Sequence, residues 1–137
     1  MSQPADPPEL VVVTRIDSQI ASLAAGTNLF QGPSRPPSSV IPHLCVNVQS
    51  YGGRSHADMG VSREDRFYRL QVRVRGNVDG YAEARTLARE IITALDRYAP
   101  GSGWVEIRVS DAGPIDLGID DTEHPIFVIN LTITYSG

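Results

Sequence analysis

The sequence predicts an α+β fold in which one mainly antiparallel or mixed β-sheet has two helices packed on its apolar face. Apolar residues recur at helical spacing in two segments and alternate with polar residues in several others. The order along the chain is helix, strands, helix, strands, and no internal repeat is visible. A chain of 137 residues has the length of one domain, so we expect residues 1–137 to form a single domain.

The first helix is predicted to begin at Asp6, an N-cap acid followed by two prolines and by Glu9. Its apolar residues recur at spacings of three and four, at Leu10, Val13, Ile16, Ile20 and Leu23. Gly26 is placed to act as the C′ residue that ends the helix. A short strand is expected at residues 28–30. Residues 32–39 then predict an extended connection, because their prolines cannot donate ladder hydrogen bonds.

Two strands are predicted next, at residues 43–51 and 68–75, because apolar and polar side chains alternate in both. The inward sets are Leu44, Val46 and Val48 in the first strand and Tyr68, Leu70, Val72 and Val74 in the second. Residues 52–65 contain two adjacent glycines and mixed charges without a period, which is typical of a long hairpin loop.

A second helix is predicted from an Asp79 cap to the Pro100-Gly101 stop. Its buried stripe is expected to comprise Tyr81, Ala84, Ala88, Ile91, Leu95 and Tyr98. A short strand follows with Val105, Ile107 and Val109, and then an acidic loop over residues 113–124. The last strand is expected over residues 126–135, with Phe127, Ile129, Leu131 and Ile133 inward and Asn130, Thr132 and Thr134 outward.

Composition and charge exclude several classes of protein. The net charge of −4 argues against a general nucleic-acid binder, which carries a basic excess to displace counterions. The sequence has no apolar run near the roughly 20 residues that cross a membrane, and its N-terminus does not have the pattern of a secretory signal. Cys45 is the one cysteine, so no internal disulfide forms, as suits a reducing cytoplasm. We therefore expect a soluble protein with no membrane partner.

No set of residues predicts a catalytic, cofactor or metal site. His43, Cys45 and Asn47 are the residue types of a cysteine protease, but alternate positions of one strand lie about 7 Å apart, too far for a nucleophile–base hydrogen bond. An alternative is a small enzyme or metal-binding module built on His56, Asp120 and His124. Their spacing matches no common metal motif, so we predict a protein that is not an enzyme and needs no cofactor.

Charge is distributed unevenly along the chain. Five arginines cluster on and before one strand, at Arg63, Arg66, Arg69, Arg73 and Arg75, whereas a later segment without basic residues carries Asp111, Asp116, Asp120, Asp121 and Glu123. One interpretation is a solvated sheet face beside an ordinary acidic loop. The other is that the two patches meet between copies of the chain, a heterologous contact that can close a ring. The interface predicted on this second interpretation comprises Arg66, Arg69, Arg73, Arg75, Asp116, Asp120, Asp121 and Glu123.

The order of motifs resembles that of the tail terminator (minor tail, tail-completion) proteins of long-tailed bacteriophages. The resemblance covers nearly the whole chain. It comprises the leading helix, Asn28-Leu29-Phe30 with its proline-rich connection, Val46-Asn47-Val48 to Tyr51-Gly52-Gly53, Leu70 to Gly76, the helix from Tyr81 to Leu95, and Gly113 to Gly118 before the final strand. The segment Val72-Arg73-Val74-Arg75-Gly76 followed by a helix is its strongest part.

The resemblance implies a structural role in the virion tail, at its head-proximal end, for a protein made in the cytoplasm of the host bacterium. Members of this family form a homohexameric ring on the last ring of the major tail tube protein, stop further polymerisation, and dock to head-completion (neck) proteins. DNA passes through the lumen without sequence-specific binding. A neck or head-completion adaptor of the same assembly is the alternative role.

Overall fold

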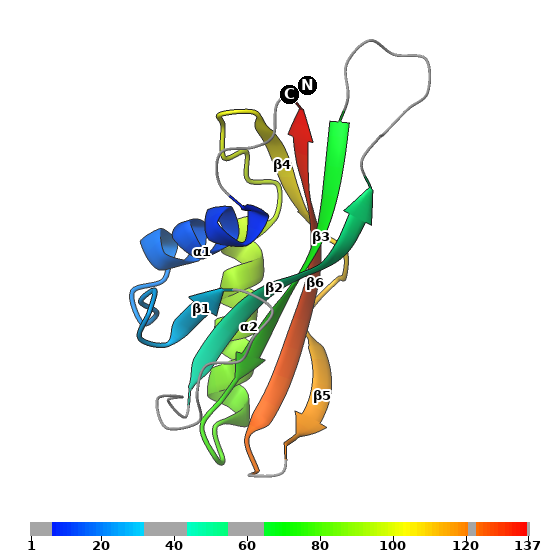
Figure 1. The fold of residues 1–137 in the computed structure, drawn as a ribbon. Coiled ribbons are helices and arrows are strands. Elements are labelled where there is room, and N and C mark those ends of the chain that lie inside the picture. Colours follow the sequence, from blue (N-terminus) through cyan, green and yellow to red (C-terminus); the bar gives the residue numbers. More distant parts are fainter. Residues whose placement is uncertain (1–6, 32–43, 55–64, 121–122, 137) are drawn as a thin grey trace.

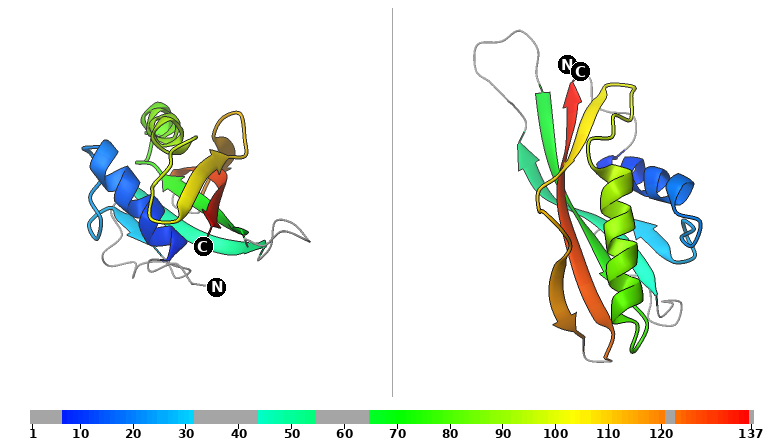
Figure 2. Two further views of the ribbon diagram at one scale, coloured as in Figure 1. Left: turned by 90° about the horizontal axis from the view of Figure 1, so that it is seen from above. Right: turned by 180° about the vertical axis from the view of Figure 1, so that it is seen from behind.

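The computed structural model describes residues 7–31, 44–54, 65–120 and 123–136. Its elements, in chain order, are α1 (Pro8–Gln19), β1 (Leu29–Gln31), β2 (Cys45–Arg54), β3 (Asp65–Arg75), α2 (Tyr81–Leu95), β4 (Trp104–Val109), β5 (Ile115–Ile119) and β6 (Pro125–Ser136). The six strands form one mixed sheet, and both helices lie on the same side of it (Figure 1 and Figure 2). The predicted α+β fold is confirmed. Neither described helix has the length and apolar character needed to cross a membrane.

The sheet has the strand order β1-β2-β3-β6-β4, and β5 is an additional strand that pairs with β6. Among the described strands, β1 and β2 are parallel, whereas the other pairs are antiparallel. The long strand β6 pairs along one side with β3 and divides its other side between β5 and β4. Two separate short strands therefore occupy one margin of the sheet, end to end.

The core lies between the sheet and the helices. Leu70, Val72 and Val74 of β3 are fully buried, as the alternation predicts, and so are Ile129, Leu131 and Ile133 of β6. The buried stripe of α2, Ala84, Leu87, Ala88, Ile91 and Leu95, packs against this face. Burying each large aliphatic side chain contributes about 1.5–3 kcal/mol. The helix α1 is tied to α2 by Arg15, whose Nε donates to the Ala94 carbonyl at 2.9 Å.

The predicted limits of α1 are wrong at both ends. The N-cap residue is Pro7 rather than Asp6, and the helix ends at Gln19, well before Gly26. The Asn28 side chain accounts for the early end: it accepts a hydrogen bond from the Ala24 N–H at 2.8 Å and donates to the Ser22 carbonyl at 2.9 Å. These bonds satisfy backbone groups outside a helix and so favour the turn. Gly26, with φ +87°, belongs to that turn.

The second helix also differs from its prediction. Its N-cap is Gly80 rather than Asp79, and it ends at Leu95 rather than near Pro100. Tyr81 is not buried, since 47% of its surface is exposed, although its ring contacts Phe127 with a centroid distance of 5.1 Å. The predicted stripe was therefore correct for Ala84, Ala88, Ile91 and Leu95 and wrong for Tyr81, while Tyr98, which is partly buried, lies beyond the end of the helix.

Three strand predictions require correction. The strand β2 runs beyond Tyr51, because Gly52 and Gly53 pair with Arg69 and Tyr68 of β3 after a β-bulge. In β4 a bulge next to Trp104 shifts the register, so that Trp104 and Ile107 are buried while Val105 is 50% exposed. The predicted acidic loop over residues 113–124 contains the strand β5.

Gly76 allows the start of α2 to lie close to the sheet. A Cβ atom at Gly76 would lie 2.5 Å from the Ala84 Cβ and 3.0 Å from the Pro125 Cγ, inside contact distance. We therefore expect Gly76→Ala to lower the free energy of unfolding by about 1–3 kcal/mol, measured by urea denaturation, because overpacking forces a backbone shift.

Gly113→Ala is the matched control, because no atom lies within 4 Å of its added Cβ. We expect it to change stability by less than about 0.5 kcal/mol. Ala84→Gly removes the clashing methyl group, so the double variant should lose less stability than the sum of the two single variants. Strict additivity would show that the clash is not the cause.

Candidate functional site

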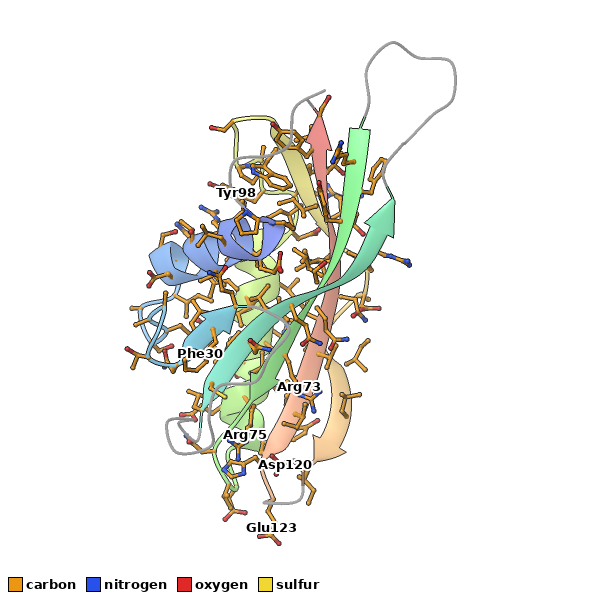
Figure 3. The ribbon with its side chains drawn as sticks, viewed as in Figure 1. Phe30, Arg73, Arg75, Tyr98, Asp120 and Glu123 are labelled. Carbon is orange, nitrogen blue, oxygen red and sulfur yellow. The ribbon has the colours of Figure 1, made fainter. Side chains whose placement is uncertain are left out.

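The face of the sheet opposite the helices carries polar residues of β2, β3 and β6, Arg73 among them (Figure 3). Asn47 of β2 pairs with Arg73 of β3, and Gln71 pairs with Asn130 of β6. The Gln71 Nε2 donates to the Asn130 Oδ1 at 3.3 Å, which links neighbouring strands across this face. Arg69 and Arg73 are both exposed and occupy alternate positions of β3 on the same face. The structure therefore brings part of the predicted basic patch together.

Arg66 does not belong to that face. Its cross-strand partner is Tyr135, a core residue. It is also separated from Arg69 and from Arg73 by an odd number of positions along β3, whose pairing with β6 is regular. Because side chains alternate between faces, Arg66 lies on the helix side of the sheet. Arg63 lies outside the described residues.

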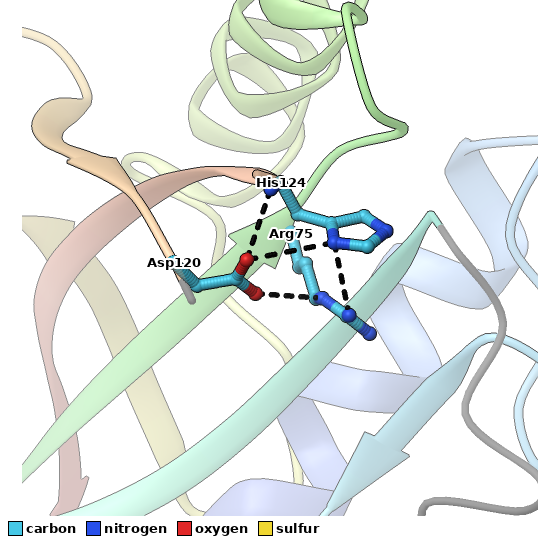
Figure 4. Close-up of polar contacts among 3 residues, drawn as sticks. All are labelled: Arg75, Asp120 and His124. Atoms are coloured by element: carbon cyan, nitrogen blue, oxygen red, sulfur yellow. Dashed lines mark hydrogen bonds and ion pairs between the residues drawn. The ribbon is translucent and has the colours of Figure 1, made fainter. Parts of the chain in front are cut away.

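Arg75 forms a compact cluster with Asp120 and His124 (Figure 4). The Arg75 Nε donates to the Asp120 Oδ2 at 3.1 Å, and the Arg75 Nη2 lies 3.1 Å from the His124 Nδ1. The other carboxylate oxygen, Oδ1, accepts the His124 backbone N–H at 2.9 Å. His124 is only 4% exposed. The cluster fastens the β5–β6 connection to the end of β3, so two residues predicted for opposite patches are joined within one chain.

The alternative metal or catalytic site gains no support from this geometry. A guanidinium next to His124 places a positive charge where a metal ion would bind. The described residues contain no group of three or more His, Cys, Asp or Glu side chains able to hold a metal, and His56 lies outside them. Burial raises the pKa of the Cys45 thiol and outweighs the opposing effect of Arg75, so the reactive thiolate is disfavoured. His43 also lies outside the described residues.

The predicted acidic patch is divided as well. Asp116 accepts a hydrogen bond from the Tyr81 hydroxyl at 2.9 Å and another from the Gly118 N–H at 2.8 Å. The first of these bonds raises the pKa of Tyr81. Glu123 is exposed in the β5–β6 connection, and Asp121 lies outside the described residues. Asp116 and Glu123 therefore remain at the surface, while Asp120 is held by Arg75.

The strand β5 is the surface feature that the sequence analysis missed. All five of its residues are exposed, including Ile115 at 37%, Leu117 at 54% and Ile119 at 66%. Within the part of the chain that the structure describes, it pairs with β6 alone. An edge strand that exposes aliphatic side chains is a ready template for another chain. The alternation of aliphatic residues at 115, 117 and 119 was the available signal, hidden among acidic residues and glycine.

Comparison with known proteins gives a family and a fold. The sequence model of a family described as "Bacteriophage tail terminator protein" matches residues 39–136, well over half of the chain. No curated protein matches significantly. Among solved structures, a chain from the "Virion of native gene transfer agent (GTA) particle" is similar over 100% of both chains, with a TM-score of 0.74 and 14% sequence identity. At that identity the structural likeness concerns the fold.

Proposed function

Because this chain belongs to the bacteriophage tail terminator family, and is thus a structural protein of the virion tail, we propose that it closes the tail tube as a ring. The homohexameric ring stops the addition of major tail tube protein and offers the head-completion (neck) proteins a docking surface. DNA passes through its lumen without sequence-specific binding, which suits a chain with a net charge of −4. The role requires binding surfaces rather than a catalytic centre.

The observation that carries this proposal is the uncovered strand β5. Leu117 and Ile119 expose more than half of their surface, and nothing in the described part of the chain covers them. Soluble proteins usually protect such an edge with charge, proline or a covering element, because an open apolar edge promotes association. A subunit that works inside an assembly can leave the edge open for its neighbour.

The charged residues support a head-to-tail arrangement of subunits. The interface predicted from the sequence comprises Arg66, Arg69, Arg73 and Arg75 on one copy and Asp116, Asp120, Asp121 and Glu123 on the next, but Arg66 lies on the helix side of the sheet, away from Arg69 and Arg73. We assign most of the attraction between copies to Arg69, Arg73, Asp116 and Glu123, because all four are exposed in the structure. Two different patches that meet form a heterologous contact, which generates a ring when its rotation closes.

A charge-swap experiment tests this ring. One variant carries Arg69→Glu and Arg73→Glu, and a second carries Asp116→Arg and Glu123→Arg. Each variant alone places like charges across every interface and should remain monomeric in native mass spectrometry. A mixture should assemble again, because alternating copies restore opposite charges at both kinds of interface. The mixed ring should contain equal numbers of the two variants.

Arg89→Glu is the control, because Arg89 is exposed on α2 and belongs to neither charged patch. It should assemble like the unchanged chain. The proposed pairing of patches is wrong if either charge variant alone forms the same oligomer as the unchanged chain. A chain that stays monomeric at every concentration, even beside tail tubes, contradicts the ring itself.

A further inference from the structure

The margins of the sheet differ in how well the chain's own residues cover them. The outer side of β4 is closed, because the Ile107 N–H donates to the Tyr98 carbonyl at 2.8 Å and the Ile107 carbonyl accepts the Arg97 N–H at 2.7 Å. The Val109 N–H donates to the Asp96 Oδ1 at 2.9 Å. These bonds use the backbone groups that would otherwise pair with another strand, so β4 is not an available edge.

The outer side of β1 is likewise occupied. Ala25 forms a parallel bridge with Leu29, and the Gly26 N–H donates to the Leu29 carbonyl at 2.9 Å. The strand has three residues, and the turn that precedes it lies along its margin. Sheet extension at β1 would have to displace this turn.

Two edges have no strand on their outer side in the described part of the chain. One is β5, which pairs only with β6. The other is the second half of β2, because β1 pairs with Val46, Asn47 and Val48 and ends there. Beyond Val48, residues 49–54 of β2 continue as strand and pair only with β3. We define these two surfaces as the β5 edge and the β2 edge.

The two edges are suited to each other. The β5 edge has five residues and the β2 edge has six, so their backbones match in length. Gly52 and Gly53 have no side chain, which allows a second backbone to approach closely. The exposed Arg69 of β3 is the cross-strand partner of Gly52 and places a positive charge next to the β2 edge. The strand β5 carries Asp116 and is followed by Glu123, so the charge at the β5 edge is negative.

We propose that the β5 edge of one copy pairs with the β2 edge of the next, so that the sheets of neighbouring subunits are continuous through the ring. This inference rests on the proposed ring and adds the strands that form it. Within one copy β5 and β2 run in opposite directions, as their antiparallel links through β6 and β3 require. Rotation about an axis close to the strand direction leaves the direction of each strand unchanged. The β5 edge of one copy and the β2 edge of a neighbour related by such a rotation would therefore form an antiparallel pair.

The positions of the two edges define the geometry of such a ring. The β5 edge lies near the end of the sheet where β3 ends and β6 begins, and the β2 edge lies near the opposite end (Figure 1). Joining them shifts successive sheets along their strands. A shifted sheet closes only when its strands tilt from the ring axis, as in a β-barrel. The strands of the assembled ring are therefore expected to be inclined to its axis.

Cross-linking of cysteine variants tests the strand pairing. All variants are made in the full-length chain with Cys45→Ser. Each double variant has one cysteine on the β5 edge, Ile115→Cys or Leu117→Cys, and one on the β2 edge, Gln49→Cys or Ser50→Cys. The four combinations sample both faces of the β2 edge and neighbouring registers. We expect at least one, treated with a short bismaleimide beside tail tubes, to yield a ladder of covalent oligomers on a denaturing gel. Each single variant should yield no ladder, because its cysteine faces none on the neighbour.

The possible outcomes separate this inference from the proposed function. Dimers from Ile115→Cys or Leu117→Cys alone would show that two β5 edges pair with each other, which overturns the inference. Native oligomers of normal mass without cross-links in any double variant overturn the strand pairing and leave the ring intact. If the Cys45→Ser parent and the unchanged chain both fail to assemble beside tubes, the ring itself is wrong.

Discussion

Phage tails assembled without this protein are expected to be longer than normal and to carry no head. The end of a growing tube presents the same binding surface after each added ring, so polymerisation continues until that surface is blocked. We propose that this chain, a member of the tail terminator family, blocks it and replaces it with a surface for the neck. Its removal therefore affects both tube length and head attachment, which is the largest effect expected from any change described here.

Electron microscopy of particles produced without the protein measures both quantities. Supplying the chain from a separate gene should restore normal length and attached heads, which is the control for indirect effects. Tails of normal length that fail to join heads would instead identify a neck or head-completion adaptor. Tubes of ordinary length on full capsids would contradict both roles.

The second large effect is expected from placing charge on the β5 edge. Leu117→Asp combined with Ile119→Asp should weaken association between subunits by roughly 100-fold or more, because buried carboxylates at an interface lack partners. The isolated chain should keep its stability within about 0.5 kcal/mol, since both side chains are more than half exposed in it. Analytical ultracentrifugation measures the first quantity and urea denaturation the second.

Val105→Asp is the matched control for this prediction. Val105 is 50% exposed, similar to Leu117, but it belongs to β4, whose outer side is closed by the chain's own backbone. It should therefore assemble normally. Equal loss of assembly in both variants would show that added charge, rather than the β5 edge, is responsible.

The local pattern correctly predicted the strands that bury one face in the core and leave the other face more exposed. Strand β3 alternates strictly and buries Leu70, Val72 and Val74 in the core, so these predicted inward residues were correct. The last strand was correct for the same reason, with Phe127 and Ile129 inward. Period two identifies a strand when one face is buried and the other is not.

The errors fall where a second contact overrides the local pattern. The helix α1 ends early because the Asn28 side chain stabilises a turn, although Ile20 and Leu23 remain buried beyond the helix. Val128 of β6 is buried although it lies on the face away from the helices, where Ile115 of β5 is its cross-strand partner. Such contacts join residues that are too far apart in the chain for a local sequence pattern to relate them.

The sequence by itself determined the α+β class, the principal strands and helices, the separation of basic and acidic segments, and the resemblance to tail terminators. Only the tertiary structure decided which charges are paired within the chain, because Arg75 and Asp120 are 45 residues apart and are brought together by the pairing of β3 and β5 with β6. It also decided which sheet edges are open. Whether an edge is covered depends on the backbone groups that fold back against it, and these come from turns whose positions the local pattern does not specify.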